Sequence, residues 1–294
     1  MIKDSVLDLV GETPIVYLKK LSEKYHNNIY VKLEGGNPFG SIKDRIAKKI
    51  ISSAFKDGLI NQSTTIIEAT SGNTGIGLAG VCLYYNLPLI IIMPNNVSNE
   101  RILLLKAYHT KVILTDKKYG MKGCLDKLKE MTSTMNNYFI PSQFENMNNP
   151  LTHYEITGKE ITNCLSEIDG IVMGIGTGGT ISGIGKYFKE KSPTTLIIGV
   201  LPKENNVIDG IGPGFIPSTL NLKVVDNIYN ISRESSKQGC EELLTSEALF
   251  CGFSTGAAFI GVKKLIEEKN LVNRNILFIS PDYGIKYLSK WIDE

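Results

Sequence analysis

Short apolar, β-branched runs alternate along this chain with longer segments in which apolar residues recur with helical spacing. The short runs predict strands and the longer segments predict helices. Strands are expected at 29–33, 65–69, 88–93, 111–115, 170–173, 195–200, 223–230 and 275–280, after a turn and a short strand within 7–18. Helices are expected after Lys43 and at 74–85, 98–108, 119–134, 152–165, 179–189, 233–246 and 255–268.

This alternation predicts an α/β protein, because strands that alternate with single helices form parallel sheets with helical crossovers. A chain of 294 residues is long enough for two such lobes. We find no linker, low-complexity segment or repeat in it. We therefore expect two interleaved three-layer α/β lobes with mostly parallel sheets.

The composition argues against several classes of function. The 32 basic and 30 acidic residues give a net charge of +2 without a basic block, so nucleic acid is not an expected partner. The N-terminus lacks the apolar run of a secretory signal, and no stretch reaches the length of a membrane span. The cysteines are widely spaced, which indicates reduced thiols in a cytoplasmic protein without a disulfide framework or a metal site. They are Cys82, Cys124, Cys164, Cys240 and Cys251.

The turn from Asn37 to Arg45 places one lysine, Lys43, at the start of a predicted helix. An amine in the first helical turn, among apolar neighbours, lies near the positive end of the helix dipole, and both effects favour its neutral form. A neutral lysine amine can attack an aldehyde and form a Schiff base. Lys43 is therefore a candidate covalent cofactor anchor. The alternative is a solvated helix lysine beside Asp44.

A second turn, Glu68 to Gly75, lies directly between a predicted strand and a predicted helix. In open α/β sheets, ligands bind at such turns, where free backbone N–H groups face an anion. The turn also carries short hydrogen-bonding side chains, so it would suit the carboxylate of an amino acid. The alternative is an ordinary helix start that Ser71 or Asn73 caps.

The turn from Gly174 to Thr180 has the same position, and Gly174, Gly176 and Gly179 match the G-x-G-x-x-G spacing of dinucleotide-binding loops. An NAD(P)-binding oxidoreductase needs an acidic residue at the end of the next strand to bind the ribose. The only acidic residue near that position is Glu204, which is not placed cleanly at the strand end, and this argues against a dinucleotide site. Hydroxyls and backbone N–H groups at a helix start suit a terminal phosphate better. We favour a phosphate site.

A fourth turn, Gly252 to Ala258, opens an apolar helix. Ser254 in this turn is a candidate N-cap of that helix, which would be a purely structural role. A serine there can also hydrogen-bond a ring nitrogen of a ligand, so both interpretations stay open.

In order and spacing, these four turns resemble those of the cysteine synthase (O-acetylserine sulfhydrylase) family. The likeness covers nearly the whole chain and includes Val10-Gly11-Glu12-Thr13-Pro14, Ser98-Asn99-Glu100-Arg101 and Tyr287-Leu288-Ser289. This family, which includes cystathionine β-synthase, consists of fold type II pyridoxal-phosphate enzymes with a tryptophan synthase β-like fold. The resemblance implies pyridoxal 5′-phosphate as cofactor. It also implies a larger cofactor-phosphate-binding lobe (1–35 plus 143–294) and a smaller mobile lobe (36–142) with the substrate-carboxylate loop.

The resemblance also implies a role for each matching residue. Lys43 would hold the cofactor covalently and move the α-proton of the substrate, Asn73 would bind the 3′-oxygen of the cofactor, and Ser254 would face its pyridine nitrogen. The cofactor phosphate would be bound by Gly176, Thr177, Gly178, Gly179 and Thr180. The substrate would be bound by Thr70, Ser71, Gly72, Thr74, Gln143 and Gly210.

The implied reaction is β-replacement, most simply the formation of cysteine from O-acetylserine, or a similar activated serine, and sulfide. A homodimer, and docking of the C-terminus of a serine acetyltransferase, are implied as well. A purely non-catalytic docking module is disfavoured because Lys43, Asn73 and Ser254 are intact.

Asp209 stands where O-acetylserine sulfhydrylases usually carry an uncharged residue. As a general base it would activate water or a thiol. That role would fit an enzyme that takes cysteine, releases sulfide and forms serine, lanthionine or cystathionine. The alternative is a solvent-exposed loop aspartate.

Overall fold

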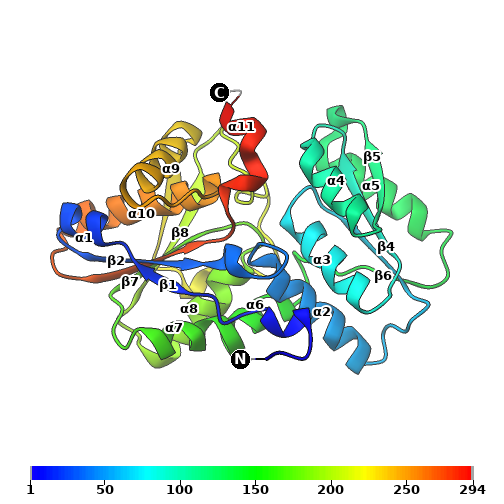
Figure 1. The fold of residues 1–294 in the computed structure, drawn as a ribbon, viewed down its shortest axis with the longest axis horizontal. Coiled ribbons are helices and arrows are strands. Elements are labelled where there is room, and N and C mark those ends of the chain that lie inside the picture. The colour runs from blue at the N-terminus through cyan, green and yellow to red at the C-terminus, as the bar shows by residue number, and fades with distance from the viewer. Residues whose placement is uncertain (1, 293–294) are drawn as a thin grey trace.

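The computed structural model describes residues 2–292, and its strands form two separate sheets (Figure 1). The six-stranded sheet has the order β1-β2-β10-β7-β8-β9, and the four-stranded sheet has the order β5-β4-β3-β6. The larger sheet consists of β1 (Ile15–Tyr17), β2 (Asn28–Leu33), β7 (Gly170–Gly174), β8 (Leu196–Pro202), β9 (Asn227–Ile231) and β10 (Asn275–Ser280). The smaller sheet consists of β3 (Thr65–Ala69), β4 (Leu89–Pro94), β5 (Lys111–Thr115) and β6 (Tyr138–Phe139).

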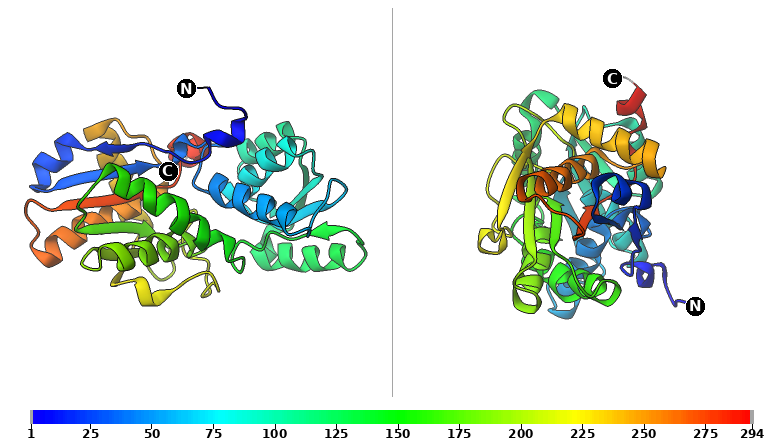
Figure 2. Two further views of the ribbon diagram at one scale, coloured as in Figure 1. Left: turned by 90° about the horizontal axis from the view of Figure 1, so that it is seen from below. Right: turned by 90° about the vertical axis from the view of Figure 1, so that its left-hand side faces the viewer.

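The two sheets are interleaved in the sequence. The chain enters the larger sheet with β1 and β2, builds the smaller sheet between residues 65 and 139, and then returns to the larger one. Among the described strands, β1 pairs antiparallel with β2 and all other pairs are parallel. The views in Figures 1 and 2 show the sheets as two bodies side by side. The expected α/β class with mostly parallel sheets is thus confirmed.

Helices cover both faces of each sheet. On the larger sheet, one core contains residues of α1, α9 and α10, and the other contains residues of α7 and α8. On the smaller sheet, α2, α3 and α4 pack on one face and α5 packs on the other. None of the helices in residues 2–292 is both long and apolar enough to cross a membrane. The helices are α1 (Lys19–Tyr25), α2 (Lys43–Lys56), α3 (Asn73–Tyr84), α4 (Asn99–Ala107), α5 (Gly120–Thr132), α6 (Asn148–Thr152), α7 (Gly158–Cys164), α8 (Gly179–Lys191), α9 (Arg233–Glu247), α10 (Phe253–Lys269) and α11 (Leu288–Ile292).

Two expected elements differ in the structure. The segment expected as one helix at 152–165 is helical, but it consists of a π-helical turn (His153–Thr157), continuous with α6, followed by α7. That turn packs so closely on α8 that a Cβ at Gly183 would lie 2.6 Å from the His153 Cβ and 2.8 Å from the Tyr154 backbone nitrogen. The strand expected at 223–230 begins only at β9, because a 3₁₀ turn (Leu222–Val224), capped by the Asn221 side chain, precedes it.

A buried ion cluster joins β2, α2 and α7. The Arg45 guanidinium donates to Glu34 (2.6 and 2.8 Å) and to Glu160 (2.7 and 2.7 Å). Lys32 Nζ lies 2.8 Å from the same Glu160 carboxylate. Burial acts to raise the pKa of Glu34, but Arg45 and Lys32 outweigh it and hold that pKa below its usual value. Arg45 lies in the first turn of α2, two residues after Lys43. The cluster therefore holds in place the start of the helix that carries Lys43.

Replacing Glu34 by Gln keeps the shape of the side chain and removes the charge that balances Arg45 and Lys32. Because an unbalanced buried charge is costly, we expect the free energy of unfolding to fall by about 3–5 kcal/mol. Urea denaturation followed by circular dichroism measures the change. Glu130→Gln, which removes an exposed ion pair with Lys127, is the control and should hardly move the midpoint. Equal midpoints for the two variants would contradict the prediction.

Candidate active site

Lys43 begins α2 at the junction of the two sheets, where it lines two adjoining cavities. The preceding residue, Ile42, is tied to the end of β10 by a backbone hydrogen bond to Pro281 (2.9 Å). Burial of the Lys43 amine lowers its pKa to about 8, and the nearby Asp282 carboxylate offsets only part of that effect. The lysine is therefore not a solvated helix residue, and a substantial fraction of its amine is neutral near physiological pH.

The turn after β3 forms the wall of the larger cavity beside Lys43. Thr70, Ser71, Gly72, Asn73 and Thr74 all line it, and Gln143 joins them from the segment after β6. The Thr74 hydroxyl donates to the Gln143 side-chain oxygen (2.5 Å). The structure thus brings together all the residues expected to bind the substrate, including Gly210, which enters the cavity from a separate loop.

Neither Ser71 nor Asn73 caps the helix that follows. The N-cap of α3 is Gly72, and no side chain caps it. The simple capping interpretation of this turn is therefore wrong. The first N–H groups of α3 keep their capacity to bind a ligand.

Asn73 is held by two residues that the sequence analysis did not single out. Its Nδ2 donates to Asp282 (2.6 Å), and its Oδ1 accepts from Lys286 (3.1 Å). Asp282 also accepts from the Tyr287 hydroxyl (2.6 Å), and its other carboxylate oxygen is buried without a partner among the described residues. Lys286 donates in addition to the carbonyls of the turn before Lys43. The one available signal was the position of Asp282 just after a predicted strand.

The glycine turn after β7 lines the smaller cavity. Gly176, Thr177, Gly178 and Thr180 face that cavity, and α8 begins at Gly179. Side chains are excluded here, since a Cβ at Gly176 would lie 2.3 Å from the Gly210 carbonyl oxygen. Gly179 itself does not line the cavity, and its N–H points toward the Thr177 hydroxyl (3.4 Å). A tight turn at a helix start suits a phosphate monoester.

His153 supports this turn from behind, which the sequence analysis missed. Its Nε2 lies 3.3 Å from the Thr180 hydroxyl, and its Nδ1 lies 3.0 Å from the Thr157 hydroxyl. Burial, aided by the positive charges of Arg45 and Lys43, lowers the pKa of His153 well below its usual value. The ring is therefore neutral and can hydrogen-bond both hydroxyls.

Ser254 and Gly210 complete the smaller cavity. Ser254 lies in the first turn of α10, but the N-cap of that helix is Gly252, so the capping interpretation of Ser254 is wrong. Its side chain is only 4% exposed and lines the cavity, and its hydroxyl makes no hydrogen bond within residues 2–292. Gly210 has φ +86°, which favours glycine, and it lines both cavities. A buried hydroxyl without a partner that faces a cavity can bind a ring nitrogen.

These features fit pyridoxal phosphate. The structure offers a buried amine with a lowered pKa for the aldehyde, a glycine turn at a helix start for the phosphate, and an unbonded serine hydroxyl for the ring nitrogen. A dinucleotide does not fit this site. Glu204, the candidate acid for binding its ribose, is exposed and lines neither cavity.

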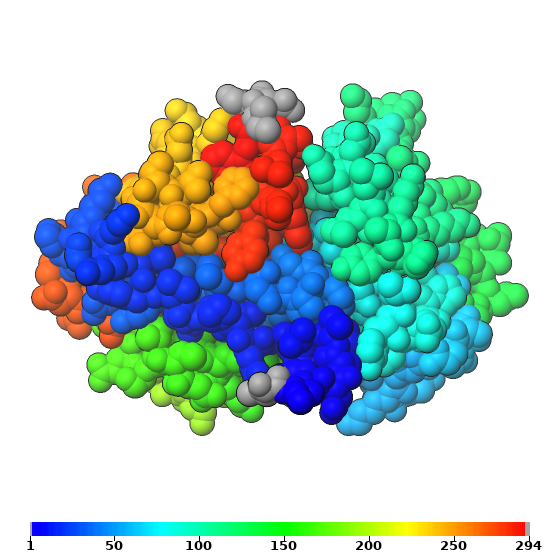
Figure 3. Space-filling view, in the orientation of Figure 1, coloured from blue at the N-terminus to red at the C-terminus, as the bar shows by residue number. Residues whose placement is uncertain are grey.

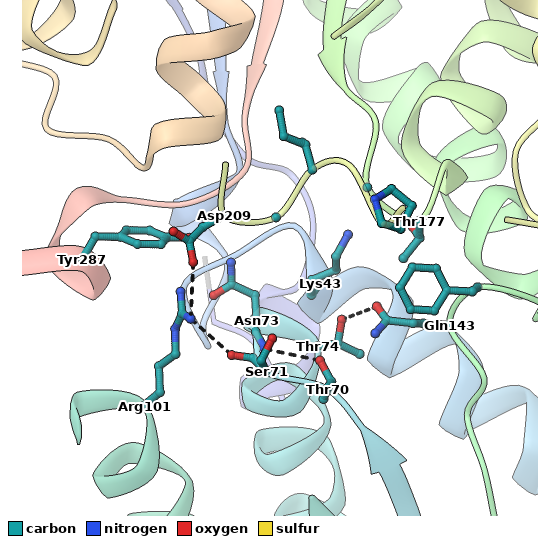
Figure 4. A pocket seen from close by; sticks show the side chains of 16 residues that line it. Lys43, Thr70, Ser71, Asn73, Thr74, Arg101, Gln143, Thr177, Asp209 and Tyr287 are labelled. Carbon is teal, nitrogen blue, oxygen red and sulfur yellow. Dashed lines mark hydrogen bonds and ion pairs between the residues drawn. The ribbon is translucent and has the colours of Figure 1, made fainter. Parts of the chain in front are cut away.

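Asp209 lies in the wall of the larger cavity, so it is not a solvated loop residue. Both of its oxygens accept from Lys290 Nζ (2.7 and 2.8 Å), and Arg101 lies 3.8 Å away. Figure 4 shows Arg101 reaching from α4 toward Asp209 and Ser71. In Figure 3, the surface is hollowed between the red C-terminal helix α11 and the teal segment that contains α4. Neither Arg101 nor Lys290 carried a predicted role.

Comparisons with known proteins agree with this geometry. Residues 6–282 match the family model described as "Pyridoxal-phosphate dependent enzyme". A cysteine synthase of Staphylococcus aureus is 37% identical over 97% of this chain and 96% of its own. The crystal structure of a hydrogen sulfide-producing enzyme from Fusobacterium nucleatum has a TM-score of 0.93 and 43% identity, over 97% of this chain and 100% of that one. A cysteine synthase of Entamoeba histolytica has a TM-score of 0.94 and 34% identity, over 98% of this chain and 90% of that one.

The chain belongs to the family of pyridoxal-phosphate dependent enzymes. Its fold is that of the fold type II members, as the resemblance implied. The expected cofactor is thus confirmed, and the dinucleotide alternative is set aside.

The lowered pKa of Lys43 predicts how fast cofactor-free protein captures pyridoxal phosphate at each pH. Only the neutral amine attacks the aldehyde, so the rate should rise with pH and level off above about pH 8. An ordinary lysine would continue to gain about tenfold per pH unit until near its usual pKa. Absorbance of protein-bound cofactor measures the rate, and Lys43→Ala should capture none covalently. A rate that keeps rising to about pH 10 would contradict the prediction.

Proposed function

We propose that this protein catalyses β-replacement on serine-type amino acids and forms cysteine from O-acetylserine, or a similar activated serine, and sulfide. The observation that carries this proposal is the single cavity that joins Lys43 to the turn from Thr70 to Thr74 and to Gln143. An amino acid whose carboxylate bound that turn would lie beside the lysine amine. The relatives named cysteine synthase support the same reaction.

In this proposal the cofactor, when bound, supplies an electron sink for charge that develops at the α-carbon of the substrate. Lys43 holds it covalently, Asn73 binds its 3′-oxygen, and Ser254 faces its ring nitrogen. Its phosphate is bound by Gly176, Thr177, Gly178, Gly179 and Thr180. Asp282 and Lys286 fix the orientation of the Asn73 amide from both sides.

The substrate residues orient the amino acid for proton transfer. Its carboxylate accepts from the turn after β3 and from Gln143, and Gly210 leaves room beside the reacting carbons. The substrate set is Thr70, Ser71, Gly72, Thr74, Gln143 and Gly210. Lys43 then accepts the α-proton, and a pKa near 8 suits a base that works at neutral pH.

We propose that residues 36–142 form a smaller lobe that closes over the substrate, and that residues 1–35 and 143–294 form the larger lobe. The cores support this division, because the two clusters on the smaller sheet draw on residues 47–128 apart from Leu7. The two clusters on the larger sheet draw on residues 18–31 and 161–287, apart from Ile42. Such a division allows one body to move on the other.

A homodimer, a serine acetyltransferase C-terminus as partner, and a cytoplasmic location belong to the proposal as well. The location rests on the cysteines, which are free thiols, four of them buried.

A second candidate function is the release of sulfide from cysteine. Two observations favour it: Asp209 lies in the cavity wall, and a relative of 43% identity is named a hydrogen sulfide-producing enzyme. The ion pair with Lys290 occupies both oxygens of Asp209, so action as a general base requires release from that pair.

The first test compares the two directions. We expect the purified holoenzyme to consume sulfide and form cysteine with O-acetylserine, and Lys43→Ala to lose this activity by at least about 10⁴-fold. Sulfide electrodes and amino-acid analysis measure the reaction. Faster sulfide release from cysteine than sulfide consumption would favour the second candidate. Absence of both reactions would overturn β-replacement.

Asp209→Asn tests the proposed base. Hydrosulfide arrives already ionised, so cysteine formation should change less than about threefold, whereas attack by water or a thiol should slow by about 100-fold or more. Asp126→Asn, an exposed aspartate on α5, is the matched control. If both reactions slowed equally, Asp209 would be acting through structure and not as a base.

A further inference from the structure

Arg101 is a buried cation in the wall of the proposed substrate cavity. It lies in the first turn of α4, and only 8% of its surface is exposed. Its Nη1 donates to the Ser71 carbonyl (3.2 Å), which is its one hydrogen bond within the described residues. Its Nε is buried without a partner. Because a guanidinium carries five N–H donors, most of the donors of Arg101 remain unused.

The surroundings of Arg101 leave its charge unbalanced. Lys290 binds both oxygens of Asp209 at 2.7 and 2.8 Å, whereas the Arg101 guanidinium lies 3.8 Å from the nearer oxygen. Two cations and one carboxylate give this group a net charge of +1. Since Lys290 already neutralises Asp209, the positive charge of Arg101 is available to a ligand.

Aromatic packing fixes the direction of the guanidinium. Its central carbon lies 5.2 Å from the centroid of the Tyr287 ring. That ring cannot rotate away freely, because its hydroxyl donates to the buried Asp282. Arg101 is therefore held in place before any substrate arrives, which reduces the cost of using it in the reaction.

Arg101 lies on the side of Lys43 opposite to Gln143. In Figure 4, Arg101, Asp209 and Tyr287 occupy one side of the lysine side chain, Gln143 and Thr177 occupy the other, and Thr74 lies below the lysine, bonded to Gln143. Within residues 2–292, Lys43 and Arg101 are the two cationic side chains that line this cavity. A substrate with its carboxylate near Thr74 and Gln143 and its α-carbon beside Lys43 would extend its β-substituent toward Arg101.

We propose that Arg101 stabilises the negative charge that develops on the oxygen leaving group of the first substrate. The inference rests on the proposed β-replacement and deepens it by naming the leaving group as an anionic oxygen, either a carboxylate or a phosphate. In the elimination the bond between the β-carbon and the ester oxygen breaks, its electron pair leaves with that oxygen, and the α-proton passes to Lys43. Hydrosulfide then supplies the electron pair of the new C–S bond, and Lys43 returns the proton to the α-carbon, so the net reaction exchanges acetate or phosphate for hydrosulfide.

The geometry assigns leaving-group selectivity to Arg101. A hydrogen-bonded guanidinium assists oxygen anions most, because they accept strong charge-assisted hydrogen bonds. Chloride, as the conjugate base of a strong acid, departs with less help. A phosphate leaving group carries more charge than a carboxylate, so it should depend on Arg101 more strongly.

The experiment measures kcat/KM of the holoenzyme for O-acetylserine, O-phosphoserine and β-chloroalanine, in wild type and in Arg101→Met, Arg101→Lys and Lys106→Met. Arg101→Met should lower kcat/KM for the better of the two oxygen esters by about 100-fold. The fold-decrease in kcat/KM of Arg101→Met for β-chloroalanine should be smaller than the fold-decrease for that ester by a factor of at least about ten. Arg101→Lys should keep part of the activity, since it retains the charge and loses the planar fork. Lys106→Met removes an exposed cation from the same helix and should match wild type.

The outcomes separate the inference from the function on which it rests. An equal loss for all three substrates would mean that Arg101 binds the α-carboxylate or only supports the fold, and would overturn the inference. A lower thermal unfolding temperature, or less absorbance from bound cofactor, in Arg101→Met would show that Arg101 only supports the fold. An unchanged rate with the esters would overturn it as well. If wild type eliminated chloride but neither ester group, the inference would fail while β-elimination stood. If wild type used none of the three, the proposed function would fail too.

Discussion

Burial of the Lys43 amine at the junction of two sheets is the constraint on which the rest of this structure depends. A charged amine in such a place is unfavourable, and the protein responds by lowering its pKa to about 8. The position is held from both sides. The ion cluster of Arg45, Glu34 and Glu160 anchors α2 to the larger sheet, and the Ile42 backbone is tied to the end of β10. A lysine held this way is ready to react with an aldehyde.

The C-terminal segment after β10 connects the two cavities. Asp282 binds Asn73 and Tyr287, Lys286 binds Asn73 and the turn before Lys43, and Lys290 binds Asp209. This segment therefore contacts the walls of both cavities that Lys43 lines. Arg101, which stacks on Tyr287 and touches Ser71, links it to the smaller sheet. In the proposed closure, a movement of the smaller lobe would change these few contacts.

The sequence by itself determined most of the fold and much of the site. β3 and β10 lie where the apolar runs placed them, because a buried parallel strand is a short local pattern that needs no partner to be recognised. The three glycine turns were also found locally, since each precedes a helix and the turns at 68–75 and 174–180 also follow a strand. Their order and spacing identified the family and hence the cofactor. Local patterns failed where packing overrode them, as in the π-helical turn that follows α6 and sits against Gly183.

Only the tertiary structure decided which residues support those turns and which hydroxyls stay free. Ser71, Asn73 and Ser254 all read locally as N-caps, and the structure gives the N-cap positions to Gly72 and Gly252 instead. Asp282, Lys286, His153 and Arg101 are ordinary charged or polar residues in their own segments. They become part of the site because the carboxyl ends of parallel strands from both sheets converge on one place. Burial, the charges of distant residues and the pairing of Asp209 with Lys290 exist only after that convergence, so no local pattern could reveal them.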